Sequence, residues 1–409
     1  MEKSKAEAEV FSFKTFEEEA VKQLKEGKPL EGKDGVLAPL IKRLVEASLE
    51  GELDAHLQED KKKSRNRRNG KTSKQVKTGF GTVPITTPRD RDGSFEPQTL
   101  AKRQTTLGEA LDHKVISMYS KGMSYSDICA HLEDLYGLLV SPATLSAITD
   151  RVLEDIKRWQ NRPLESVYPI VWLDAIHYKV KDQGSIKTKA VYCVIGLNRE
   201  GIKDLLGLYI GESEGARFWL GVLSELQNRG VRDIFISCID NLKGFAEAIE
   251  TVFPQTEVQL CVIHQLRNSF RYITHREKKN VLPDLKDIYQ APTLEQAERG
   301  LFQLNEKWAA RYPLLVNSWL NNWSRLSNYL KYPKEIRRLI YTTNIIESFH
   351  SQLRKVTKTK RVFHSDQALL KLLYLVYQNN KNGWIKMVNG WKQIQQQMAI
   401  IFGERYTQP

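Results

Sequence analysis

The chain has 409 residues, of which 41% are hydrophobic and 27% are charged, a globular composition with enough apolar material for two or three domains. No apolar run approaches the roughly 18 residues that span a bilayer, and the first residues lack the layout of a signal peptide. We therefore expect a cytoplasmic protein without membrane attachment. Single cysteines in regular segments also favour a reducing compartment over a disulfide framework: Cys129, Cys193, Cys238 and Cys261.

Positive charge is concentrated in one segment. The formal net charge is +13, but residues 61–77 hold nine lysines and arginines and no acid, so the other 392 residues carry only +4. Such a block is typical of a solvated arm that binds nucleic acid, although a solubility tail has the same composition. Residues 36–57 show helix spacing, and residues 79–97 predict a short strand and an extended turn. We predict a helical DNA-binding region over 1–105, with contacts from Lys61, Lys62, Lys63, Arg65, Arg67, Arg68 and Lys71.

Residues 106–160 predict three short helices separated by two tight breaks. Gly122 marks the first break, Gly137 ends the second helix, and Ser141-Pro142 is a typical helix start. Three helices with such turns fit a helix-turn-helix whose last helix enters the DNA major groove. A plain helical connector would show the same pattern.

From residue 165 the pattern changes to strands. Up to residue 264, β-branched and aromatic runs alternate with helices in the order of three strands, helix, strand, helix, strand. This order predicts an α/β fold on a mixed five-stranded sheet. Residues 265–340 show only helix spacing and predict an all-α insertion, whose tryptophans we assign mostly to its core. Residues 341–409 predict helices that complete the α/β core.

Two aspartates occupy positions where a carboxylate is unfavourable unless it has a partner or a function. Asp174 lies inside the first strand between apolar neighbours, where it needs a partner, and a hydrogen-bonded core residue would also fit. Asp240 ends the fourth strand, at the sheet edge where open α/β folds hold their sites, and a cap for the next helix would also fit. If these strands are neighbours, the carboxylates meet, and a divalent cation would offset their repulsion.

A third carboxylate stands alone among cations. Glu347 is the only acid in residues 341–361, and no lysine or arginine follows it at positions 350 and 351. We predict that it completes, with the two aspartates, an oxygen-only site for two Mg²⁺ ions, which Mn²⁺ can replace. A capping box with Asn344 is the alternative. The cations after it are candidate phosphate contacts: Arg354, Lys355, Lys358, Lys360 and Arg361.

Six segments along the chain carry a resemblance to a known family: RDRDGSFEPQ (89–98), GMSYSDICAHLEDLYGLLVSPATLS (122–146), WLDAIHYKV (172–180), GESEGARFWLGVLSELQNRGV (211–231), DNLKGFAEAIETVFPQTEVQLCVIHQLRNS (240–269) and EIRRLIYTTNIIESFHSQLRKVTKTK (335–360). On these segments the chain resembles the mutator-type transposases of bacterial insertion sequences, from about residue 35 to the C-terminus.

The resemblance implies an RNase H-like catalytic core with a triad of two aspartates and a glutamate, here Asp174, Asp240 and Glu347. The family also shares a Cys-x-x-His, here Cys261 and His264. Two residues cannot close a tetrahedral zinc site, so we expect them to support or position groups near the site, with core packing as the alternative. Asn241 departs from the glycine more usual in the family, which alters the φ preference of that turn.

These observations predict a DNA transposase associated with the bacterial nucleoid. It would bind double-stranded DNA at the terminal repeats of its element and, as at least a dimer, cut the strands and join them elsewhere. A nuclease that cuts without joining, and a DNA-binding regulator without catalytic activity, are the alternatives.

Overall fold

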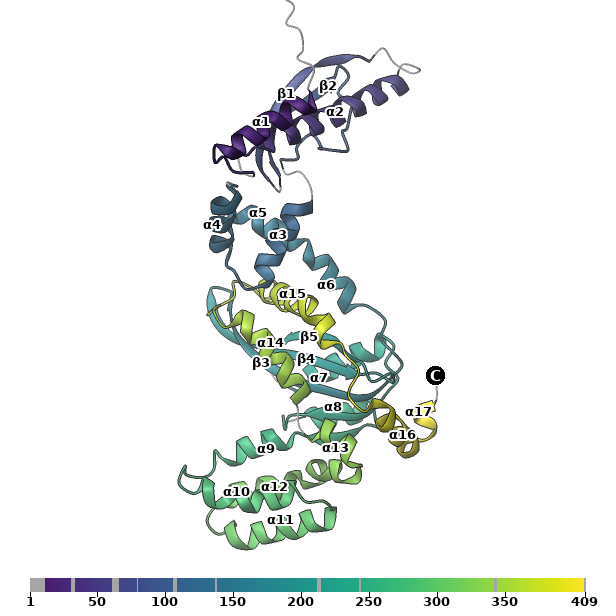
Figure 1. Cartoon of the computed structure of the whole chain (residues 1–409). Helices are drawn as coiled ribbons and strands as arrows, with labels where there is room; N and C mark the ends of the chain where they lie inside the picture. The colour runs from purple at the N-terminus through teal and green to yellow at the C-terminus, as the bar shows by residue number, and fades with distance from the viewer. Residues whose placement is uncertain are drawn as a thin grey trace, which may run out of the picture. The chain divides into compact units, whose positions relative to one another are not determined.

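The computed structural model describes residues 12–30, 34–60, 66–78, 80–105, 109–136, 138–211, 215–242, 244–341 and 344–407. The chain divides into two compact units, Met1–Arg151 and Val152–Pro409 (Figure 1). Within the described ranges, no helix is both long and apolar enough to cross a bilayer.

The first part of the first unit combines helices with a hairpin. It contains α1 (Phe13–Lys25), α2 (Ala38–Asp60) and the antiparallel strands β1 (Arg68–Thr78) and β2 (Gly81–Asp90). Alternate residues of the strands face α2 and bury their side chains, as the twofold period of a strand requires. The resulting core consists of Val45, Leu49, Val76, Val83, Ile85 and Leu100.

Strand β1 differs from the sequence prediction. Residues 68–77, predicted as part of a solvated arm in a helical region, pair with β2 along almost their whole length. The strand is polar, with only Val76 and Thr78 buried, so its apolar periodicity is too weak to identify it. Arg67 precedes the strand and is exposed. The other predicted arm residues lie outside the described residues: Lys61, Lys62, Lys63 and Arg65.

The three helices predicted after residue 106 are present as α3 (Glu109–Ser120), α4 (Tyr125–Tyr136) and α5 (Pro142–Asp150). Gly122 has a φ of +95° in the first break. The Ser141 hydroxyl accepts the Thr144 N–H at 3.2 Å, which confirms the predicted helix start. A fourth helix, α6 (Val152–Gln160), belongs to the second unit, where Trp159 packs against Tyr374 and Tyr377.

The second unit is built on a mixed five-stranded sheet, which confirms the predicted α/β order. The strands are β3 (Val167–Asp182), β4 (Ser185–Leu197), β5 (Lys203–Gly211), β6 (Asp233–Ile239) and β7 (Glu257–Leu260). Their order across the sheet is β5-β4-β3-β6-β7, with β3, β6 and β7 parallel and β4 antiparallel to both neighbours. Gln183 and Gly184, with φ of +46° and +82°, form the tight turn between β3 and β4.

Helices cover both faces of this sheet. On one face, Trp219 of α7 (Ala216–Asn228) packs on Tyr192 of β4 and stacks on Phe245 of α8 (Phe245–Val252). The opposite face carries α14 (Asn344–Thr357) against β3 and α15 (Asp366–Trp384) against β5 (Figure 1). Two further helices, α16 (Trp391–Phe402) and α17 (Glu404–Thr407), end the chain.

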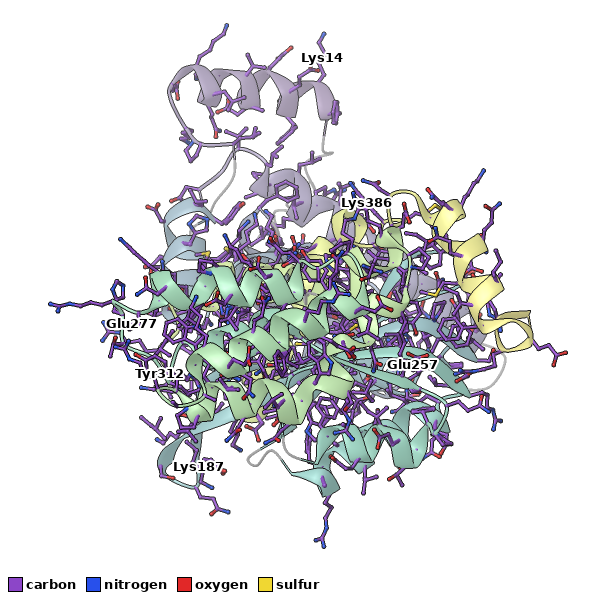
Figure 2. All side chains as sticks on the ribbon, turned by 90° about the horizontal axis from the view of Figure 1, so that it is seen from below. Lys14, Lys187, Glu257, Glu277, Tyr312 and Lys386 are labelled. Atoms are coloured by element: carbon purple, nitrogen blue, oxygen red, sulfur yellow. The ribbon has the colours of Figure 1, made fainter. Side chains whose placement is uncertain are left out.

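Between β7 and α14, the described residues form helices joined by turns and contain no strand. These are α9 (Val262–Ser269), α10 (Lys278–Tyr289), α11 (Leu294–Trp308), α12 (Pro313–Leu326), the 3-10 helix η1 (Ser327–Lys331) and α13 (Lys334–Ile340). Their side chains fill the space between the helices (Figure 2). Trp319 is buried and donates to Ser269 Oγ at 2.8 Å, so it serves the core as predicted. The same contact fixes α9 against α12.

Candidate active site

Strand register places two carboxylates side by side. Leu173 of β3 pairs with Ile239 of the parallel strand β6, and the residues that follow them are Asp174 and Asp240. The condition set in the sequence analysis, that these two strands are neighbours, is therefore met. Asp174 is buried, at 8% exposure, and its Oδ1 accepts the Ala175 N–H at 2.7 Å. Burial and, after it, the charge of the neighbouring Asp240 carboxylate together raise the pKa of Asp174 to about 7.

His350 contacts the buried aspartate from α14. Its Nδ1 lies 3.5 Å from Asp174 Oδ2, and its side chain is almost completely buried. Burial lowers the pKa of His350 to about 3, and the charges of Arg354 and His264 act in the same direction. A neutral imidazole therefore faces Asp174. The apolar stripe of α14 sets this orientation, because His350 shares it with Ile346, Phe349, Leu353 and Thr357.

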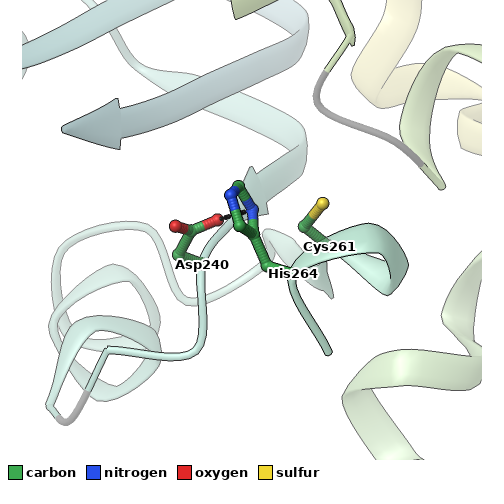
Figure 3. Close-up of side chains that lie close together, drawn as sticks. All are labelled: Asp240, Cys261 and His264. Atoms are coloured by element: carbon green, nitrogen blue, oxygen red, sulfur yellow. Dashed lines mark ion pairs between the residues drawn. The ribbon is translucent and has the colours of Figure 1, made fainter. Parts of the chain in front are cut away.

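Asp240 contacts the start of α9. Cys261 precedes this helix directly, and its backbone N–H donates to the Ile239 carbonyl at 2.9 Å. His264 lies one turn further on, and its Nδ1 forms an ion pair with Asp240 Oδ1 (Figure 3). Burial alone would lower the pKa of His264, but hydrogen bonds to Asp240 and Cys261 raise it to about 10. The Cys-x-x-His pair therefore lies beside Asp240, and its role stays a prediction.

Glu347 reaches the same cluster through an arginine. Arg267, one turn beyond His264 on α9, places its Nη1 2.8 Å from Glu347 Oε1 and 3.3 Å from His264 Nε2. The Glu347 side chain is 32% exposed. Asn344 is the first residue of α14, and residues 342 and 343 lie outside the described ranges, so the alternative capping box stays a prediction.

Exposed cations follow Glu347 on the last turns of α14 and just beyond the helix. Arg354 lies seven residues after Glu347, a spacing that places these two side chains on one face of α14, and Lys358 is exposed immediately after the helix ends at Thr357. Lys355 is exposed beside them, Arg361 is exposed beyond the helix end, and Lys360 is half-buried. Of the predicted phosphate contacts, Arg354 and Lys355 therefore lie on the helix that carries Glu347, and the others follow its end.

Two of the arm cations have structural partners. Arg68 forms ion pairs with Glu50 and Asp54 of α2, and Lys71 pairs with Glu50 at 2.6 Å. The hydrogen bonds to Lys71 and Arg68 outweigh burial and lower the pKa of Glu50. These contacts tie β1 to α2, so Arg68 and Lys71 stabilise the first unit whether or not they also face DNA.

The structure thus joins all five predicted site residues in one network and adds two that sequence reasoning missed. Arg267 and His350 were not predicted to belong to the site. The sequence held a signal for both. Arg267 lies three residues after His264, and His350 lies three residues after Glu347, and in a helix this spacing puts side chains on the same face. The turn after Asp240 also differs from expectation. Among the described residues, Gln183 is the only non-glycine with a positive φ, so Asn241 needs no left-handed backbone.

Comparisons with known proteins agree on one family. The family described as "Transposase, Mutator family" matches residues 13–387, which starts earlier than the resemblance noted in the sequence. The transposase for insertion sequence element ISRM3 of Rhizobium meliloti is 44% identical over 397 residues, covering 96% of this chain and 99% of that protein. A probable transposase for an insertion sequence element of Corynebacterium diphtheriae is 39% identical, covering 78% of this chain and 99% of its own length.

Among solved structures, the catalytic core domain of the HTLV-2 integrase in complex with magnesium aligns with 36% of this chain and 90% of its own. The identity is 15% and the TM-score is 0.18, a similarity too low to support a conclusion about fold or mechanism.

Proposed function

Because the chain belongs to the Mutator family of transposases, we propose that it cuts and joins DNA at the ends of an insertion sequence, with Asp174, Asp240 and Glu347 as the catalytic triad of an RNase H-like core. The observation that carries this proposal is the register of β3 and β6, which sets Asp174 beside Asp240 while α14 brings Glu347 to the same network.

The residues present fit a divalent cation. Two carboxylates lie together, and one of them is buried and has a raised pKa. A cation between them would offset their electrostatic repulsion. Asp174, Asp240 and Glu347 would hold Mg²⁺, or Mn²⁺ in its place, with two ions expected per site. When bound, such ions activate a water and stabilise the leaving oxygen of a phosphodiester.

The surrounding side chains hold the two aspartates in place. Neutral His350 contacts Asp174 and His264 contacts Asp240, so each aspartate has a fixed partner. Fixed partners reduce the movement needed before reaction, which is how a pre-organised site gains rate. Arg354, on the Glu347 face of α14, and Lys358, immediately after the helix, would contact the phosphates on either side of the bond that is cut.

The first unit would supply recognition of the element ends. We assign this role to the helices α3–α5, with α5 as the helix that enters the major groove, and to the cations around Arg67. Cutting leaves a 3′-hydroxyl at the element end, which then attacks a phosphodiester of a second DNA. Paired ends require at least two copies of the chain, acting on DNA in the bacterial cytoplasm.

A strand-transfer assay tests the proposal. The purified full chain is incubated with DNA carrying the flanking ends of its own element, in Mg²⁺ or Mn²⁺, beside a Glu347→Gln variant and a Glu298→Gln control on the exposed side of α11. Nicked and joined strands from wild type and Glu298→Gln alone are the expected result. Nicking without joining would indicate a nuclease, and binding without cleavage in either metal would indicate a regulator.

A further inference from the structure

Three side chains of different chemistry meet at the start of α9. One ligand atom each from Asp240, Cys261 and His264 lies within 4.8 Å of the other two (Figure 3). Backbone pairing produces this meeting: Ile239 of β6 pairs with Leu260 of β7, so the residues that follow these partners, Asp240 and Cys261, end up side by side. His264 then falls on the same side of the first helical turn as Cys261.

This set of donors differs from that of the carboxylate triad. Magnesium selects hard oxygen ligands, whereas a thiolate, an imidazole and a carboxylate together suit zinc. Zinc sites that keep one open position use three protein ligands with water as the fourth. The sequence alone offered two such ligands, Cys261 and His264, and the fold adds Asp240 as the third.

The surroundings also suit a bound cation. Cys261 is 2% exposed, so its sulfur is shielded, while about a fifth of the side-chain surface of His264 and Asp240 remains open to solvent. Cys261 is the residue immediately before α9, and the positive end of a helix dipole stabilises negative charge there.

We propose that Asp240, Cys261 and His264 form a second metal site for Zn²⁺ or another thiophilic divalent cation, and that this cation competes with the catalytic Mg²⁺ for Asp240. The competition rests on the proposed function, whereas the site itself does not. Nitrogen and sulfur ligands bind Zn²⁺ far more tightly than Mg²⁺. Trace zinc would therefore bind Asp240 and keep this carboxylate from Mg²⁺, even when magnesium is in excess. The site would thus hold the transposase inactive in zinc-replete cells.

Cobalt spectroscopy on the full chain tests the site. Metal-free protein is titrated with Co²⁺, and the thiolate-to-cobalt charge-transfer band is followed in wild type, Cys261→Ser and Cys129→Ser. Cys129 is the matched control, because it lies in the first unit and its sulfur donates to the Val140 carbonyl. The expected result is a band in wild type and Cys129→Ser that is lost in Cys261→Ser. No band in wild type, or an undiminished band in Cys261→Ser, would overturn the proposal.

Circular dichroism shows whether Cys261→Ser is folded. If it is not, a second variant tests the site. His264→Asn keeps the thiol and removes the imidazole, and its Co²⁺ affinity should fall by at least about tenfold. An unchanged affinity would overturn the three-ligand site.

Competition is measured by binding rather than by activity. Mn²⁺ bound to the protein is followed by electron paramagnetic resonance while Zn²⁺ is added. Zn²⁺ should displace Mn²⁺ from wild type and, at the same concentration, leave it bound in Cys261→Ser. Equal displacement from both proteins would refute the competition. If the strand-transfer assay fails while the cobalt band appears, the proposed function is wrong and the metal site stands.

Discussion

Arg267 on α9 and Glu347 on α14 form an ion pair, with 2.8 Å between Nη1 and Oε1. The same guanidinium nitrogen lies 3.3 Å from His264 Nε2, and the other ring nitrogen of His264 contacts Asp240. Arg267 thus connects the glutamate to the Asp240 end of β6. Its positive charge takes the place beside Glu347 that a divalent cation would need.

Replacing Arg267 by glutamine should therefore tighten metal binding, since the competing cation is removed. Stability should change little, because an ion pair in which the arginine side chain is 57% exposed and the glutamate 32% exposed contributes at most about 1 kcal/mol. Mn²⁺ titration by calorimetry measures the affinity, and thermal unfolding measures the stability. Arg325→Gln, which removes ion pairs with Glu247 and Glu250, is the control and should leave Mn²⁺ affinity unchanged. Weaker Mn²⁺ binding in Arg267→Gln would mean that the arginine positions Glu347 rather than competes for it.

Metal binding should itself stabilise the second unit. A ligand that binds only the folded state at about 100 times its dissociation constant adds about 2.7 kcal/mol, which is a rise of roughly 5–10 °C in Tm for a unit of this size. Mg²⁺ or Mn²⁺ should produce this rise in wild type and much less of it in Asp174→Asn, as measured by calorimetry. Glu298→Gln should respond like wild type. An equal rise in Asp174→Asn would show that the cations bind somewhere other than beside this aspartate.

Acid should destabilise the first unit through Asp90. This buried carboxylate accepts hydrogen bonds from Asn66 Nδ2 at 3.0 Å, the Ser94 N–H at 2.8 Å and the Phe95 N–H at 3.2 Å. Burial alone would raise its pKa, but the hydrogen bonds from Asn66, Ser94 and Phe95 outweigh it and lower the pKa to about 2. Because the folded-state pKa lies below the unfolded one, the contribution is complete above about pH 4 and is lost as the pH falls toward 2.

The loss expected from Asp90 is on the order of 2 kcal/mol. Asp90→Asn should lose comparable stability near neutral pH and show a flatter acid profile, measured by urea unfolding between pH 2 and about 7. Asp92→Asn changes a neighbouring exposed carboxylate and should follow wild type. A profile for Asp90→Asn as steep as that of wild type would assign the acid sensitivity to other groups.

The exposed face of α14 should carry a measurable share of DNA affinity. If Arg354 and Lys358 each neutralise one phosphate, Arg354→Gln and Lys358→Gln should each reduce the slope of log Kd against log salt by about 1. The change should be the same for element ends and unrelated DNA, because phosphate contacts carry no sequence information. Lys392→Gln, at an exposed position of α16, is the control. An unchanged slope in both α14 variants would remove this face from the DNA interface.

Much of the second unit could be predicted because its sequence patterns are unambiguous. The aromatic and β-branched runs identified the strands around Asp174 and Asp240, and their adjacency needed only the assumption that the two strands are neighbours. Register then placed the carboxylates together. Arg267 could not be found in this way, because its partner Glu347 is 80 residues away in sequence and the helices between them decide which side chains meet.

The first unit shows the opposite case. β1 has almost no apolar residue to indicate a strand, and it is held by pairing with β2 and by charged contacts to α2. Composition alone therefore predicted a DNA-binding arm where the chain forms a hairpin. A cluster of positive charge identifies a possible DNA interface. Whether each cation can contact DNA depends on whether it already pairs with an acid of the protein.

Arg67 and Arg68 make this distinction testable. Arg68 is paired with Glu50 and Asp54, whereas neighbouring Arg67 is exposed. Arg68→Gln should lower the stability of the first unit, by up to about 1 kcal/mol for partly exposed pairs, and change the salt slope of DNA binding little. Arg67→Gln should leave thermal unfolding unchanged and reduce the slope by about 1. If Arg68→Gln instead reduces the slope as much as Arg67→Gln, DNA phosphate displaces the carboxylates of α2, and β1 is part of the DNA interface as well as of the core.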